Sequence, residues 1–201
     1  MARRAAAVTS FDAAYYARFY GDRRTRVADA ASTRRLGELV CAYLRFLRVP
    51  VTDVLDIGCG MGHWQRVIAA QFPRARYTGV ERSEYLCRRK GWQLGSVVDY
   101  RHPISVDLVV CQGVLQYLDE DDARKAIANL TDLTHCALYL EALTTADWQD
   151  NCDRARTDGN VHLRPATFYR RLLRRNFQSC GGGLFVRHDA GISMFELERG
   201  A

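Results

Sequence analysis

Lysine is nearly absent from this chain, which carries only Lys90 and Lys125 in 201 residues. The formal net charge of +6 therefore comes almost wholly from arginine, and the arginines are spread along the sequence. A nucleic-acid-binding surface would be expected to concentrate its positive charge on one face. The distribution argues against a nucleic-acid partner.

Clustered cysteines and long apolar runs are also missing. The seven cysteines form no C-x-x-C pair and show no zinc-type spacing, so neither a disulfide framework nor a metal site is expected. No apolar run approaches the about 18 residues of a membrane span. The arginines at positions 3 and 4 are not followed by the apolar core of a signal peptide. We therefore expect a soluble cytoplasmic protein without a membrane partner, either a monomer or a homodimer.

A glycine-rich turn between two apolar segments is the most informative feature that is present. Residues 51–64 read VTDVLDIGCGMGHW, which predicts a buried strand, a turn with glycine at positions 58, 60 and 62, and a helix. Glycine has no Cβ, so backbone N–H groups and a helix N-terminus can approach a ligand closely. The pattern predicts a ligand-binding loop; the alternative is a tight turn that needs glycine only for positive φ.

Apolar periodicity along the rest of the chain alternates between strand and helix. Strands are expected at 77–81, 95–99, 106–111 and 136–142, and helices at 28–47, 64–72, 83–90, after 119 and after 165. Two final strands, 177–188 and 192–198, are expected to form an antiparallel hairpin. Such alternation predicts a parallel α/β sheet that binds ligands at the carboxyl ends of its strands. The length fits one domain, with residues 1–47 as an N-terminal helical cap and 48–201 as the α/β core.

Three motifs stand in the order found in one enzyme family. They are VLDIGCGMG at 54–62, YTGVERS at 77–83 and VDLVVCQGVLQYL at 106–118. With them the chain resembles the class I S-adenosylmethionine-dependent methyltransferases, in particular small, single-domain, bacterial-type enzymes that act on small molecules. The resemblance implies a Rossmann-like, doubly wound, mostly parallel seven-stranded sheet with a C-terminal antiparallel hairpin and helices on both faces.

A nicotinamide-linked oxidoreductase is the main rival, because a glycine turn followed by an acidic residue also marks dinucleotide sites. In the pattern G-x-G-x-x-G counted from Gly58, the last glycine would fall on His63, whereas this chain has Gly62. Asp56 would also face an anionic pyrophosphate in a dinucleotide, but a cationic sulfur and amine in the methyl donor. Unlike charges attract, so the methyl donor is favoured.

The resemblance assigns roles in donor binding residue by residue. Asp56, with the turn residues Gly58, Cys59, Gly60 and Gly62, is similar to the part that holds the methionine end of S-adenosylmethionine. Glu81, followed by Arg82, resembles the residue that accepts hydrogen bonds from both ribose hydroxyls. Val97 or Asp99 would lie by the adenine, and Gln112 and Gly113 would border the transferring methyl group.

Acceptor binding and catalysis are placed on the two least regular segments. Candidate residues are Tyr15, Tyr16 and Tyr20 from the aromatic segment 11–20, Gln116 and Tyr117 after the fourth strand, and Trp148, Asp150, Arg156 and Arg164 after the fifth. His162 is the first choice for a general base, because neutral imidazole accepts a proton near pH 7. Glu141, which ends the fifth strand, is the second choice.

The acceptor itself is less well defined by the sequence. The turn CQGV at 111–114 lacks the N/D-P-P-Y/F pattern of enzymes that methylate amino groups of nucleic acids, which disfavours that class. A small molecule with an amine, hydroxyl or carboxylate, methylated on N or O, fits better. Arg156, His162 and Arg164 would suit an acidic acceptor. A donor-binding or partner-binding module with lapsed catalysis is the alternative function, with a protein or RNA methyltransferase further behind.

Overall fold

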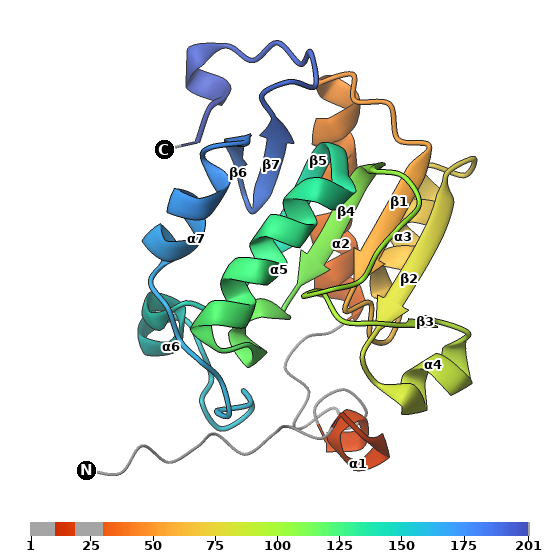
Figure 1. Cartoon of the computed structure of the whole chain (residues 1–201), viewed down its shortest axis with the longest axis vertical. Coiled ribbons are helices and arrows are strands. Elements are labelled where there is room, and N and C mark those ends of the chain that lie inside the picture. Colours follow the sequence, from red (N-terminus) through yellow and green to blue (C-terminus); the bar gives the residue numbers. More distant parts are fainter. Residues whose placement is uncertain (1–10, 19–29, 201) are drawn as a thin grey trace.

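The computed structural model describes residues 11–18 and 30–200, and a seven-stranded sheet lies at its centre (Figure 1). The strand order is β3-β2-β1-β4-β5-β7-β6. The strands are β1 (Asp53–Ile57), β2 (Arg76–Glu81), β3 (Gln93–Leu94), β4 (Val106–Gln112), β5 (Thr134–Glu141), β6 (Phe177–Gly181) and β7 (Leu184–Arg187). Strands β1 to β5 pair in parallel, and β7 pairs antiparallel with both β5 and β6. The predicted Rossmann-like, doubly wound sheet with a terminal antiparallel hairpin is therefore confirmed.

Helices cover both faces of the sheet (Figure 1). They are α1 (Ala13–Tyr16), α2 (Ala30–Phe46), α3 (His63–Gln71), α4 (Glu84–Lys90), α5 (Glu120–Leu133), α6 (Thr145–Asp150) and α7 (Ala166–Leu173), with single 3-10 turns η2 (Leu115–Tyr117) and η3 (Glu196–Glu198). No helix in the described ranges is long and apolar enough to cross a membrane.

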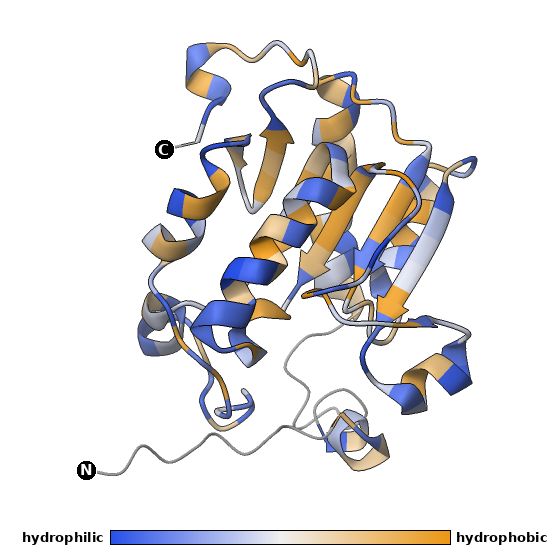
Figure 2. Cartoon of the chain, viewed as in Figure 1, coloured by the Kyte–Doolittle hydropathy of each residue, from blue (hydrophilic) through white to orange (hydrophobic). Residues whose placement is uncertain are grey.

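Strand β4 shows why the sheet is covered on both sides. Val109 and Cys111 pack into a cluster with α5 and α7, whereas Leu108 and Val110 pack into a second cluster with α2 and α3. Successive side chains of a strand point to opposite faces, so an uninterrupted apolar run needs a helical layer on each side. Figure 2 shows these central strands as the most hydrophobic part of the chain, with the polar face of α5 turned outward.

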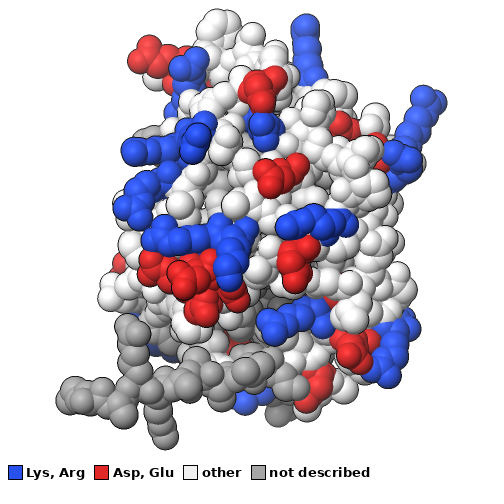
Figure 3. Space-filling model, in the orientation of Figure 1, with Lys and Arg blue, Asp and Glu red and all other residues white. Residues whose placement is uncertain are grey.

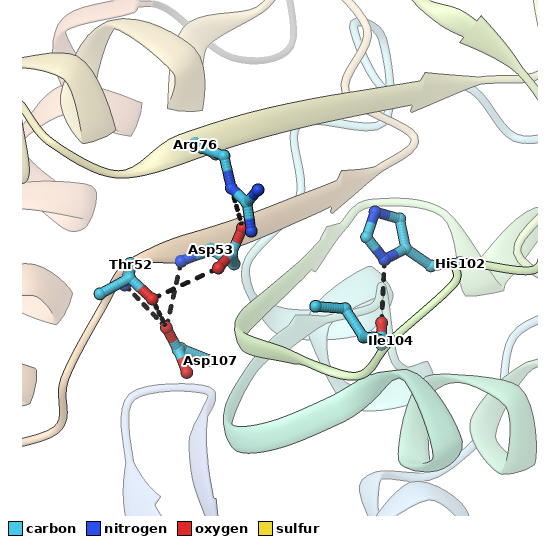
Figure 4. Close-up of polar contacts among 6 residues, drawn as sticks. All are labelled: Thr52, Asp53, Arg76, His102, Ile104 and Asp107. Atoms are coloured by element: carbon cyan, nitrogen blue, oxygen red, sulfur yellow. Dashed lines mark hydrogen bonds and ion pairs between the residues drawn. The ribbon is translucent and has the colours of Figure 1, made fainter.

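The amino ends of the central strands are joined by a polar network (Figure 4). Asp107 accepts hydrogen bonds from the backbone N–H groups of Thr52 and Asp53, at 2.7 and 3.1 Å. Arg76 donates to Asp53 at 2.6 Å, and this hydrogen bond lowers the pKa of the Asp53 carboxyl. These contacts fix the register of β1, β2 and β4 at the edge of the sheet opposite the carboxyl ends.

The third strand differs from the prediction of 95–99. β3 contains only Gln93 and Leu94, and residues 97–99 form a turn. The Asn129 amide on α5 donates to the carbonyls of Val97 and Tyr100, both at 3.0 Å. A side chain thus satisfies backbone groups that a longer strand would have paired with its neighbour.

The C-terminal hairpin also turns earlier than predicted. β6 and β7 are connected at Gly181, Gly182 and Gly183, whose φ values are +81°, +57° and +80°, instead of at 189–191. Three successive residues in the left-handed region suit only glycine. The predicted strand 192–198 is wrong: this segment contains η3 and leaves Phe195 and Leu197 exposed by 82% and 99%.

Candidate functional site

The glycine turn predicted as a ligand loop connects β1 to α3 at the carboxyl edge of the sheet. Gly58, Gly60 and Gly62 have φ values of +79°, +48° and +75°. A Cβ on Gly58 would lie 2.2 Å from the Val114 side chain, and one on Gly62 would lie 2.8 Å from the Trp92 ring. A Cβ on Gly60 would meet nothing closer than 3.8 Å. Gly58 and Gly62 are thus required by packing, whereas Gly60 keeps open the space beside the turn.

Two cavities meet at this turn. The larger has a volume of about 390 Å³ and the smaller about 90 Å³. Both are lined by Gly58, Gly60, Gln112 and Gly113, which lie at the end of β4 or just after β1 and β4. One extended ligand lying across the two strand ends would therefore occupy both cavities, as expected at the switch point of a doubly wound sheet.

Glu81 supplies the carboxylate that lines the smaller cavity. Its side chain is 5% exposed and accepts hydrogen bonds from the backbone N–H groups of Gly60 at 3.0 Å and Ser83 at 2.9 Å. Arg82 and Val97 line the same cavity. A buried carboxylate at the end of β2, held by backbone donors, is well placed to accept hydrogen bonds from neighbouring ligand hydroxyls. The geometry fits the ribose role that the resemblance implies.

Asp56 lies at the end of β1 and lines the larger cavity. It is 2% exposed, and burial raises the pKa of its carboxyl to about 7, while a hydrogen bond from the Tyr77 hydroxyl lowers this pKa and the Glu81 charge raises it. Among the described residues no arginine or lysine forms an ion pair with Asp56. A cationic ligand group would offset the cost of ionising this carboxyl, which fits the sulfonium and amine of the methyl donor.

We expect donor binding to release about one proton at about pH 6, because a cationic ligand lowers the raised pKa of Asp56 and ionises it. Donor affinity should accordingly fall as the pH drops below about 7. Titration calorimetry in two buffers of different ionisation enthalpy measures the proton count. Asp56→Asn should bind more weakly and without proton release; wild-type protein that releases no proton would contradict this role of Asp56.

A row of hydrogen bonds crosses the carboxyl ends of β4 and β5. The Trp64 indole donates to Gln112 at 2.8 Å, and the Gln112 amide donates to Glu141 at 2.8 Å. Glu141 also accepts from the Tyr139 hydroxyl at 3.1 Å. These contacts hold the Gln112 and Glu141 side chains beside the turn, where both line the larger cavity.

Most of the predicted site residues line one or both cavities. Besides those named above, they include Cys59, Gln116, Tyr117 and Tyr15, and Tyr16 lines the smaller cavity. The Tyr15 and Tyr117 hydroxyls are 2.8 Å apart, and Tyr16 donates to Glu81 at 3.4 Å. Helix α1 thus packs over the glycine turn and the end of β2. Tyr20 lies outside the described residues.

The remaining predicted residues do not line either cavity: Gly62, Asp99, Trp148, Asp150, Arg156, His162 and Arg164. Asp99 is exposed on the turn that replaces the expected third strand. Arg156 is exposed and pairs with Asp153 at 3.4 Å. The backbone N–H of His162 donates to the Gln116 carbonyl at 2.7 Å. The structure does not bring Arg156, His162 and Arg164 together as a basic pocket for an acidic acceptor.

Arg164 is a buried structural residue, 6% exposed. Its guanidinium donates to the carbonyls of Leu115 at 3.2 Å, Leu118 at 2.5 Å and His162 at 3.1 Å. It therefore fixes the segment after β5 against η2. Sequence reasoning could not separate this role from substrate binding, because both place an arginine in an irregular segment.

We expect Arg164→Met to lower the free energy of unfolding by about 3 kcal/mol, since it leaves buried carbonyls without donors. Arg156→Met, at an exposed position, is the control and should change it by less than about 0.5 kcal/mol. Urea unfolding measures both. An Arg164 variant as stable as the wild-type protein would contradict the structural role.

Several lining residues were not anticipated from the sequence. Asp147 and Asp158 come from α6 and the segment after it, and Thr33 comes from α2. Trp92 donates to the Gly60 carbonyl at 2.9 Å and supports the turn from behind. No sequence signal marks these positions, since each reaches the site through the tertiary packing of an irregular or distant segment.

Comparison with known proteins agrees with the fold and the turn. Residues 55–137 match the protein family described as "Methyltransferase domain". The search of curated proteins returned no match.

Solved structures share the fold at low sequence identity. Magnesium protoporphyrin IX methyltransferase from Synechocystis PCC 6803, with bound SAH, is 18% identical, with a TM-score of 0.64 over 88% of this chain and 96% of that one. The SAM-bound amino pentose methyltransferase CalS10 from Micromonospora echinaspora is 16% identical, with a TM-score of 0.58 over 88% and 96%. DesVI from Streptomyces venezuelae is 15% identical, with a TM-score of 0.57 over 77% and 90%.

The family match spans the chain from β1 into β5, where the glycine turn, Asp56 and Glu81 are found. At these identities the solved structures establish the fold, and the family match adds the kind of domain. The described chain therefore has the fold of these methyltransferases, and its residues 55–137 are similar to a methyltransferase domain.

Proposed function

We propose that the protein transfers the methyl group of S-adenosylmethionine to a nitrogen or oxygen atom of a small molecule held in the larger cavity. The continuity of the two cavities across Gly58, Gly60, Gln112 and Gly113 carries the proposal. The smaller cavity, with Glu81 and Val97, would take the adenosine part. The larger one, with Asp56, would take the methionine part and leave room for an acceptor.

When bound, S-adenosylmethionine supplies a methyl group on a positively charged sulfur, already activated for attack. The protein then needs mainly to orient the two reactants and exclude water. Gln112 is held by hydrogen bonds to Trp64 and Glu141 and lines the larger cavity where the strands end. Tyr15 and Tyr117, joined through their hydroxyls, cover it from the side of α1.

Glu141 is our proposal for the group that accepts a proton from the acceptor. It lines the larger cavity and ends β5 directly beside Gln112. His162, the other candidate from the sequence, contacts Gln116 through its backbone and is not part of the cavity wall. A carboxylate held at a strand end satisfies the geometric requirement of a general base better than a ring outside the cavity.

The size of the cavity and the relatives both favour a small acceptor. Magnesium protoporphyrin IX and an amino pentose are the acceptors named for two of the structural relatives. We propose a molecule of this general class, without a nucleic-acid or membrane partner.

Methyl-labelled S-adenosylmethionine tests the proposal directly. The protein is incubated with the donor and a cell extract separated into small molecules and macromolecules, and the label is followed in each fraction. We expect label in small molecules other than the donor itself, and none there with Asp56→Asn. Label confined to protein or RNA, or tight donor binding without any transfer, would overturn the proposed acceptor or the proposed catalysis respectively.

A further inference from the structure

The wall of the larger cavity is acidic, although the chain as a whole is basic. Its carboxylates are Asp56, Glu141, Asp147 and Asp158, and no arginine or lysine of residues 11–18 and 30–200 lines it. The chain nevertheless holds 29 arginines and lysines against 23 aspartates and glutamates. Figure 3 shows these basic side chains on the outer surface, including the face that carries α5 and α7. The cavity thus departs in charge from the rest of the molecule.

The acidic side chains reach the acceptor part of the cavity from three different segments. Glu141 ends β5, Asp147 lies on α6 and Asp158 lies on the segment that follows. One Asp147 oxygen accepts from the Thr144 hydroxyl at 2.6 Å, and this hydrogen bond lowers the pKa of Asp147. Asp147 is therefore ionised at neutral pH, and its negative charge acts on the cavity.

Glu141 has one oxygen available for a ligand. Its Oε2 accepts from Gln112 and Tyr139, while its Oε1 accepts no hydrogen bond from the described residues. The two bonds to Oε2 hold the carboxylate in place. A ligand donor can approach Oε1 without displacing an internal partner.

Gln116 gives an independent indication of a ligand that donates hydrogen bonds. Its side chain lines the cavity and the residue is 8% exposed. The Nε2 group donates to the Gly113 carbonyl at 2.9 Å, which fixes the orientation of the amide. The other atom, Oε1, is buried and has no partner within the described structure. A buried acceptor left unpaired costs free energy, and a small movement of the Gln116 side chain toward the cavity would let a ligand N–H or O–H recover it.

We propose that the methyl acceptor is an amine that enters as an ammonium ion and is held by Glu141 and Gln116. This inference rests on the proposed function and names its substrate class. Fixed carboxylates attract an ammonium group and repel a carboxylate, whereas an alcohol gains nothing from their charge. An ammonium also carries several N–H donors, enough for both Glu141 Oε1 and Gln116 Oε1.

The reaction is balanced with the residues present. The ammonium transfers one proton to the Glu141 carboxylate, which frees the lone pair on nitrogen. The nitrogen then forms a bond to the methyl carbon as the carbon–sulfur bond breaks and its electron pair stays on sulfur. The products are a methylated ammonium and a neutral thioether, and Glu141 returns its proton to solvent.

The test measures binding of matched small molecules to protein saturated with S-adenosylhomocysteine. Saturation is first established by calorimetry; failure at this stage would count against the proposed function itself. A panel of amines is then titrated alongside the alcohol and the carboxylate with the same carbon skeleton, including glucosamine, glucose and glucuronate. We expect the amines that bind to do so at least about 10-fold more tightly than their alcohols, because a charge-assisted contact contributes that much.

A matched pair of variants locates the effect. Glu141→Gln keeps the shape of the side chain and should remove most of the preference for amines. Glu120→Gln, on the exposed first turn of α5 where Glu120 pairs with Arg124, should retain it. On the saturated wild-type protein, alcohols or carboxylates that bind as tightly as the amines, or a panel in which no amine binds, would overturn the inference. So would an amine preference that survives in Glu141→Gln.

Discussion

Glu81→Ala is expected to bind S-adenosylmethionine at least about 100-fold more weakly than the wild-type protein, because it removes a carboxylate that accepts two charge-assisted hydrogen bonds. Glu81 is buried in the smaller cavity at the end of β2, where no other described carboxylate is among the lining residues. Water cannot easily replace it at a buried position. Titration calorimetry measures the loss.

The control for this substitution separates binding from folding. Glu81 also accepts hydrogen bonds from Gly60 and Ser83, so its loss lowers stability as well. Glu84→Ala, an exposed position three residues later, should keep wild-type affinity. Thermal unfolding identifies the folded fraction of each variant. Near-wild-type affinity in folded Glu81→Ala would show that Glu81 serves only to shape the turn.

Gly60→Val is expected to reduce donor binding by a similar factor for a different reason. A Cβ at this position meets no protein atom closer than 3.8 Å, so the valine side chain projects into the space where the two cavities meet. Filling this space excludes the ligand without a clash inside the protein. The φ value of +48° adds backbone strain for a β-branched residue. Calorimetry and thermal unfolding together report the two effects.

Gly91 provides a matched control for the strain. It has a φ of +75° and lies at the end of α4. No described atom lies within 4 Å of the position that a Cβ would take there. Gly91→Val should lose stability comparably and still bind the donor. If both variants bound the donor equally well, the turn at Gly60 would have to be regarded as structural.

The parts of the fold that the sequence predicts are those governed by local rules. The apolar run of β4 requires burial on two faces, and the spacing of Gly58, Gly60 and Gly62 requires a turn that leaves backbone groups open. The positions of Asp56 and Glu81 close to this turn can be predicted as well, because both residues lie at the ends of strands and parallel strands bring their carboxyl ends to one edge of the sheet. The gathering of Asp56, Glu81 and the glycine turn around two adjoining cavities could therefore be predicted from the sequence alone.

The residues around the proposed acceptor could not be predicted from the sequence, because tertiary contacts bring them together. Arg164 looked like a ligand of an acidic acceptor and is instead buried against the carbonyls of Leu115 and Leu118. Asp147 and Asp158 gave no signal, yet they make the cavity wall acidic. The charge of a cavity depends on which side chains of a segment turn inward, and an irregular segment has no periodicity from which to read this.

The most direct measurement is titration calorimetry of the wild-type protein with S-adenosylmethionine, S-adenosylhomocysteine and NAD. Asp56, beside the glycine turn, favours the cationic groups of the methyl donor over an anionic pyrophosphate, whereas Glu81 can accept the ribose hydroxyls of either ligand. We predict micromolar binding of S-adenosylmethionine and S-adenosylhomocysteine, and no binding of NAD in the same range. Tight binding of NAD with no binding of the other two would contradict the assignment of this site to the methyl donor.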